Sequence, residues 1–101
     1  MGAQEFMDFF EGTDVNTAFA DAVDAALYDY GHASYTGTIA EKDDFTVIQQ
    51  EPVTSEESLA LARRLLEEDD PRISDKWGPA GAIAVKDDRH SGWLFFGWAS
   101  S

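Results

Sequence analysis

Five segments of the chain have the apolar or β-branched content that favours a β-strand. They are residues 4–10, 35–41, 45–49, 80–85 and 93–98. Gly37 lies inside the second segment, where a glycine indicates a bulge or a close approach by another group. The aspartates between the second and third segments favour a turn. Residues 86–92 are expected to close a hairpin between the last two segments.

Two other segments have the three-and-four spacing of apolar residues that is typical of a helix with one buried face. In the first, this spacing runs from Val15 to Tyr30. The second begins after Thr54, whose hydroxyl can form a capping box with the carboxylate of Glu57. The acidic run 67–70 opposes the dipole of this second helix, so its last turn is expected to fray. Its inward face is expected to consist of Leu59, Ala62, Leu65 and Leu66.

The order of these elements predicts an α+β fold. We expect a two-layer β-α-β-β-α-β-β arrangement, with a mostly antiparallel five-stranded sheet and both helices on one face. This order resembles that of ferredoxin-like domains with one extra strand, an analogy of fold that carries no function. Alternating element directions would gather acidic residues at one end: Glu11, Asp14, Asp43, Asp44, Glu67, Glu68, Asp69 and Asp70. The other end would hold His32, Glu51, Glu56, Asp87, Asp88 and His90.

Length and composition favour a single folded domain over residues 1–101. Hydrophobic residues make up 44% of the chain, which is enough to build a core and argues against disorder. Cysteine is absent, which excludes disulfides, thiolate metal sites and cysteine nucleophiles. No apolar run approaches the length of a membrane span, and no secretory signal pattern is present. We therefore expect a soluble, cytoplasmic protein with no membrane partner.

The net charge of −13 arises from 20 acidic residues against 7 basic ones. Because no basic stripe is present to bind phosphates, direct nucleic-acid binding is not expected. One cause of this balance is adaptation to a salty cytoplasm, which the excess of aspartate over glutamate and the scarcity of lysine favour. The other is an acidic surface for a basic partner, such as a nucleic-acid-binding protein whose phosphate ligand it imitates.

No motif in the chain defines a reaction. His32 and His90 have no spacing that suits a metal site, and no nucleophile elbow, phosphate loop or carboxylate pair accompanies them. We therefore expect no catalytic residue, no metal and no cofactor, and we interpret the chain as non-enzymatic. One alternative stays open, a small-molecule or catalytic pocket in which a histidine transfers protons. Its residues would be His32, Tyr35, Glu41 and Trp77.

A binding surface is the preferred interpretation of the remaining aromatic and charged residues. Amphipathic rings next to a small-residue loop are typical of interface anchors, and Trp77 and Tyr35 have this setting. The competing interpretations are a buried core for the rings and an ordinary solvated face for the carboxylates. With the acidic end, the expected binding set is Tyr35, Asp43, Asp44, Glu67, Glu68, Asp69, Asp70, Arg72, Lys76 and Trp77.

Three segments carry a resemblance to a known group of proteins. They read YDYGHASYTGTIAEK over 28–42, DKWGPAG over 75–81 and LFFGWAS over 94–100. These segments resemble those of short uncharacterised proteins encoded by actinobacterial bacteriophages and mobile elements. The similarity covers most of the chain, and the first and last segments are its most distinctive parts. The resemblance implies a setting, a phage or a host that carries mobile genes, and it implies no activity and no catalytic residue.

These observations predict a small acidic accessory protein of a phage or mobile element that binds another protein, with counter-defence as one candidate role. The alternatives are the pocket described above and an ordinary salt-adapted domain whose charge reflects its solvent. An exposed sheet edge would also allow two copies to pair as a homodimer.

Overall fold

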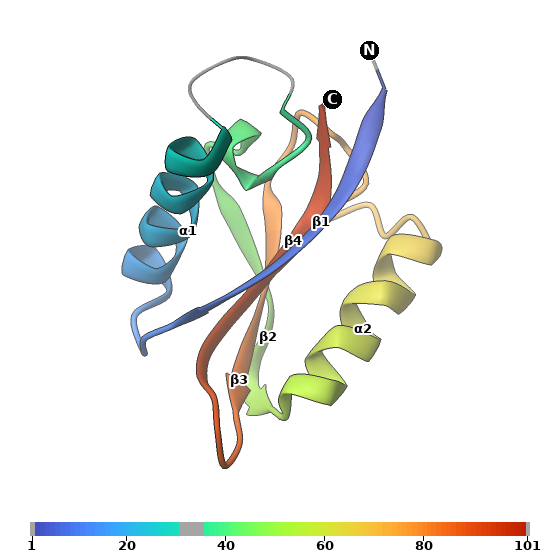
Figure 1. Ribbon diagram of the computed structural model, residues 1–101. Coiled ribbons are helices and arrows are strands. Elements are labelled where there is room, and N and C mark those ends of the chain that lie inside the picture. The colour runs from blue at the N-terminus through green and yellow to red at the C-terminus, as the bar shows by residue number, and fades with distance from the viewer. Residues whose placement is uncertain (1, 31–35, 101) are drawn as a thin grey trace.

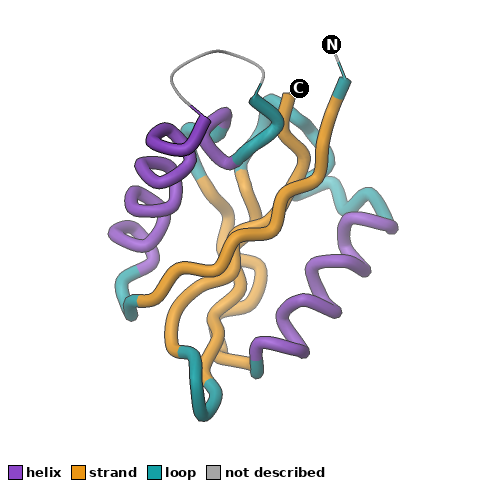
Figure 2. The backbone as a smooth tube through the Cα atoms, viewed as in Figure 1, coloured by secondary structure: helices purple, strands orange, loops and turns teal. Residues whose placement is uncertain are grey.

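The computed structural model describes residues 2–30 and 36–100, which build an α+β fold. Figures 1 and 2 show two helices on either side of a twisted sheet. Both predicted helices and four of the five predicted strands are confirmed, with small shifts of their ends. The elements are β1 (Ala3–Glu11), α1 (Val15–Tyr30), the short 3-10 helix η1 (Ile39–Glu41), β2 (Phe45–Val53), α2 (Ser55–Glu67), β3 (Ala80–Lys86) and β4 (Ser91–Ser100).

The sheet of the described residues has four strands in the order β1-β4-β3-β2 and is mixed. β4 runs antiparallel to both of its neighbours, whereas β2 and β3 are parallel. The predicted mostly antiparallel sheet of five strands is therefore wrong, although the predicted α+β class is confirmed. β3 follows α2 and lies parallel to β2, so these three elements form a β-α-β unit, which the predicted mostly antiparallel sheet did not include.

The strand predicted over 35–41 is absent from its described part, residues 36–41. Gly37 has a φ of 71°, and the Thr38 hydroxyl accepts a hydrogen bond from the Ala40 amide, which starts η1. Ile39 is buried at 1% exposure in this turn. Local bonding by threonine side chains thus competes successfully with strand formation here. Tyr35 lies outside the described residues.

The two helices lie on opposite faces of the sheet, which corrects the prediction that both lie on one face (Figure 1). Three alanines of α1, at positions 18, 22 and 26, pack with Phe95 on one face. Leu65 and Leu66 of α2 pack with Phe96 on the other. Both helices connect parallel strands, and such connections are almost always right-handed. Because the two connections cross the sheet in opposite directions, the same hand places them on opposite faces.

The strand register divides the acidic residues differently from the sequence prediction. Glu11 pairs with Gly92 at the end of the sheet where β1 finishes, and the Gly12 amide donates to the Ser91 carbonyl. Phe45 pairs with Ala80 at the other end, so Asp44 lies there. The predicted common acidic end is therefore wrong for Glu11 and for Asp14, which precedes α1. A hollow at the Glu11 end is lined by Glu56, Asp87, Asp88 and His90, as the sequence suggested.

Both ends of α2 are closed by hydrogen bonds. At the start, the predicted capping box is confirmed, since Thr54 and Glu57 bind each other's backbone amides. At the end, the Asp69 amide donates to Leu66 and the Asp70 amide to Leu65, and Asp69 has a φ of 52°. These two bonds form a Schellman motif, in which Asp69 occupies the left-handed position that is usually glycine. The structure therefore shows a closed helix end where fraying was expected.

Replacing Asp69 with glycine is expected to raise the free energy of unfolding by about 0.5 kcal/mol, because the left-handed conformation strains any residue with a Cβ. The gain is small because glycine also increases the entropy of the unfolded chain. Asp69→Ala removes the same charge but keeps the Cβ, and it is expected to lower stability. Urea unfolding measures both variants, and an Asp69→Gly variant no more stable than Asp69→Ala would contradict the assignment.

Candidate binding surface around Trp77

Lys42 is a buried lysine that joins two distant parts of the chain. Lys42 directly follows η1 in the chain and is 3% exposed. The Nζ atom donates to the carbonyl oxygens of Gly78 at 2.9 Å, Lys76 at 3.1 Å and Asp75 at 3.4 Å. Burial lowers the pKa of Lys42, and the charge of Asp75 partly offsets this effect. One ammonium group therefore fixes the backbone of residues 75–78, which we call the Trp77 loop.

Asp75 supports the same loop from inside it. Its carboxylate accepts a hydrogen bond from the Trp77 amide at 2.9 Å, and its carbonyl accepts one from the Gly78 amide at 2.9 Å. The Trp77 side chain is 63% exposed, with Lys76 Nζ 5.5 Å from the centroid of its ring. The loop thus presents a large aromatic side chain on a backbone that is held at several points.

Two of the predicted acidic residues lie beside the Trp77 loop. Asp43 and Asp44 follow Lys42 directly and are exposed. The Asp44 carbonyl accepts a hydrogen bond from the Ala80 amide at 3.0 Å, two residues after the loop ends. The backbone at Asp44 is therefore fixed two residues beyond the end of the Trp77 loop.

The remaining predicted residues form a separate group at the end of α2. Asp70 binds Arg72 through both carboxylate oxygens, at 2.9 and 3.0 Å, and also accepts from the Arg72 amide. These bonds lower the pKa of Asp70 and raise that of Arg72. Arg72 therefore closes a local turn. Glu67, Glu68 and Asp69 are exposed near the end of this helix.

The described part of the alternative pocket has another role. The Glu41 carboxylate accepts hydrogen bonds from the Thr36 amide at 3.3 Å and the Thr36 hydroxyl at 3.1 Å, so it stabilises the turn before η1. His32 and Tyr35 lie outside the described residues. Within 2–30 and 36–100, no group of three or more histidine, aspartate or glutamate side chains is placed to hold a metal ion.

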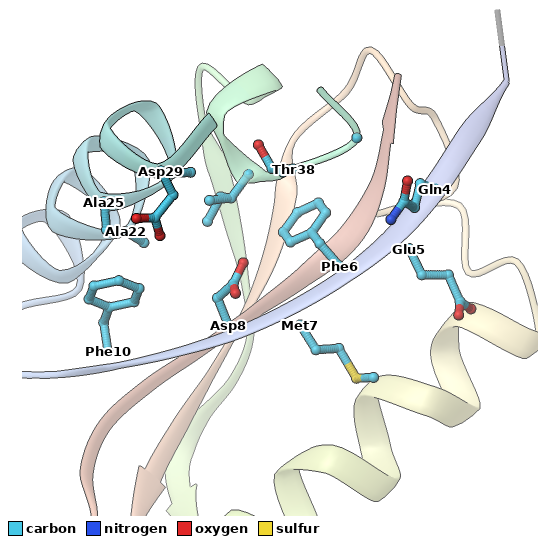
Figure 3. A pocket seen from close by; sticks show the side chains of 13 residues that line it. Gln4, Glu5, Phe6, Met7, Asp8, Phe10, Ala22, Ala25, Asp29 and Thr38 are labelled. Atoms are coloured by element: carbon cyan, nitrogen blue, oxygen red, sulfur yellow. The ribbon is translucent and has the colours of Figure 1, made fainter. Parts of the chain in front are cut away.

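A cavity that the sequence analysis missed lies between β1 and α1. Its volume is about 250 Å³, and Figure 3 shows the carboxylates of Asp8 and Asp29 directed into it from the two elements. Burial raises the pKa of Asp8. Asp8 interrupts an apolar strand face between Phe6 and Phe10, and that interruption is the signal that could have identified it.

At the end of the sheet far from the Trp77 loop, Asp87 in the β3–β4 turn caps the start of α2. Its carboxylate accepts hydrogen bonds from the amides of Ser55, Arg89 and His90, at 2.9, 3.0 and 2.8 Å. His90 Nδ1 lies 3.2 Å from the same carboxylate. The Ser55 and Arg89 amides in particular hold the pKa of Asp87 far below its ordinary value. The position of Asp87 at this end was predicted from the sequence, but the cap was not.

Replacing Asp87 with asparagine is expected to lower the urea midpoint of unfolding at pH 7. Because folding lowers the pKa of Asp87, its ionised form stabilises the protein above the ordinary value of 3.8. That stabilisation is lost as the pH falls below 3.8 toward the folded-state pKa. The difference between the wild type and Asp87→Asn should therefore shrink in acid. Asp88→Asn removes the same charge from the next residue and is expected to leave the midpoint unchanged.

No protein-family model matches this chain, and it has no significant match among curated proteins or solved structures. In the described residues, neither helix combines the length and the apolarity that a membrane span requires.

Proposed function

We propose that the protein is a small non-enzymatic accessory factor that binds a basic protein through the Trp77 loop and the neighbouring residues Asp43 and Asp44. In the setting implied by the resemblance to phage and mobile-element proteins, it acts in the host cytoplasm. The observation that carries this proposal is a tryptophan 63% exposed on a loop whose carbonyls are held by buried Lys42.

A fixed loop favours binding because association must otherwise restrict the loop and its side chains. Tryptophan is among the residues that contribute most to protein interfaces, since it buries a large rigid ring. The two adjacent carboxylates and the net charge of −13 attract a basic partner and discourage an acidic one. These three properties support a protein-binding surface and favour a basic partner.

The test compares Trp77→Ala with Tyr28→Ala, because Tyr28 is a second exposed aromatic residue, 90% exposed, on α1. Each tagged variant captures proteins from a host lysate, and the strongest candidate is then purified and titrated by calorimetry. Trp77→Ala is expected to cost about 2 kcal/mol of binding free energy, roughly a thirtyfold loss of affinity. Tyr28→Ala should bind as the wild type does, and equal binding by all three proteins would refute the proposal.

Charge reversal separates the two acidic groups. Asp43→Lys with Asp44→Lys is expected to weaken binding and to reduce its dependence on salt. Glu67→Lys with Glu68→Lys tests whether the end of α2 contributes. Asp21→Lys with Asp24→Lys makes the same change of charge on an exposed part of α1. If all three pairs weaken binding equally, the partner responds to net charge alone and the Trp77 loop is not its site.

Salt adaptation is the competing explanation of the acidic surface. It predicts that thermal stability rises continuously up to molar salt, because screening relieves repulsion among the carboxylates. It also predicts no specific loss of partner capture in Trp77→Ala. A plateau of stability at low salt, together with that specific loss, would favour the binding surface.

A further inference from the structure

β1 is an edge strand of the sheet and lies beside α1. Within the described residues, β1 pairs with β4 only, so its other edge presents backbone groups that a further strand can bind. α1 covers the face of the sheet that carries Phe6 and Phe95. The cavity between β1 and α1 therefore lies next to an open strand edge.

The side of α1 that lines this cavity is formed by small residues. Ala22, Ala25 and Ala26 line it from the helix, and the rings of Phe6 and Phe10 line it from the strand. Figure 3 shows the rings at its two ends with the Asp8 and Asp29 carboxylates between them. The space of about 250 Å³ is large enough for one long side chain with an apolar stem.

The charge of the cavity identifies the kind of side chain it suits. Among the described residues, neither cavity carboxylate forms an ion pair with a lysine or arginine side chain. Asp8 is partly buried. A charged hydrogen-bond donor strongly stabilises a partly buried carboxylate, and aromatic rings also attract cations. Lysine and arginine side chains combine both properties.

We propose that an extended basic segment of a partner protein adds as a strand to the edge of β1 and places a lysine or arginine side chain between Asp8 and Asp29. Strand addition of this kind obtains affinity from backbone hydrogen bonds and specificity from a side-chain pocket. Pairing of two copies of this chain is disfavoured, because it would bring the carboxylates of Glu5, Asp8 and Glu11 in both copies together. This site is distinct from the Trp77 loop and does not depend on the function proposed for it.

The experiment selects peptides from a random display library on the intact wild-type protein. We expect enrichment of peptides that are β-prone and carry a lysine or arginine. Synthetic versions should bind the Asp8→Asn, Asp29→Asn double variant at least about tenfold more weakly than the wild type. They should bind the Asp21→Asn, Asp24→Asn double variant as they bind the wild type, since that pair removes the same charge outside the cavity. Bound peptide should also slow hydrogen exchange of the β1 amides.

Several results would overturn the inference. One is enrichment of peptides without basic residues, and another is equal binding by the two double variants. Butylammonium that competes as strongly as the peptide would show a small-cation site without strand addition. A concentration-dependent dimer lost on peptide binding would assign the edge to self-pairing. If Trp77→Ala abolishes peptide binding, the peptides bind the Trp77 loop. That result would support the proposed function and refute strand addition at β1. Retained binding in Trp77→Ala is the expected result.

Discussion

Replacing Lys42 with methionine is expected to lower the free energy of unfolding by about 3 kcal/mol, since charge-assisted hydrogen bonds each contribute about 1.5–3 kcal/mol. Methionine keeps the apolar stem but cannot donate to the carbonyls of Asp75, Lys76 and Gly78. Removing a buried charge also removes its desolvation cost, which opposes the loss. The loss of the short bonds to Lys76 and Gly78 is expected to outweigh that relief, whereas the Asp75 carbonyl keeps its hydrogen bond from the Gly78 amide.

Urea unfolding at neutral pH measures this effect, and Lys86→Met is the matched control because Lys86 is exposed at the end of β3. The control is expected to change stability by less than about 0.5 kcal/mol. In Lys42→Met the amides of Trp77 and Gly78 should exchange faster, and capture of a Trp77-dependent partner should weaken although the tryptophan remains. Unchanged exchange in the Trp77 loop would show that Lys42 does not hold it.

Replacing Gly92 with alanine is expected to destabilise the protein by about 3 kcal/mol or more, because overpacking against backbone cannot be relieved by a side-chain rotation. Gly92 lies opposite Glu11 in the β1–β4 pair. An added Cβ would overlap the Phe10 carbonyl oxygen and would lie 2.8 Å from the Glu11 Cα. The two strands must therefore separate at this point.

The region that Gly92→Ala destabilises can also be located by hydrogen exchange. Hydrogen exchange in Gly92→Ala should accelerate first in β1 and the facing half of β4, while the parallel β2–β3 pair remains protected longer. Ser91→Ala, in the adjacent exposed position, is the control and should leave both pairs unchanged. Uniform acceleration across the sheet would contradict a defect confined to β1 and β4.

Local sequence patterns predicted the elements well and their assembly poorly. The spacing from Val15 to Tyr30 and the capping box at Thr54 are local properties, and both are confirmed. The position of the helices depends on which faces of the sheet are apolar. β3 is buried at six consecutive positions from Ala80 to Val85, a pattern typical of a strand covered on both faces. That pattern favours one helix on each side, which the prediction of a two-layer fold overlooked.

The candidate site was also predictable only where its residues form a local pattern in the sequence. Trp77, Asp43 and Asp44 were identified because exposed aromatic and acidic residues near turns are visible in the sequence. Lys42 was not singled out, since lysine is rarely buried. Its partners Asp75 and Gly78 lie 33 and 36 positions further along the chain. No local pattern carries such a pairing.

One hydrogen bond connects the two proposed binding surfaces, the Trp77 loop and the edge of β1. Lys76 Nζ donates to the Gly2 carbonyl at 3.3 Å, so the Trp77 loop adjoins the residue that precedes β1. A single partner with a basic tail could therefore occupy the loop and the strand edge together. Its second attachment would then be intramolecular, at an effective concentration set by the short tether, and two weak contacts would yield one slowly dissociating complex.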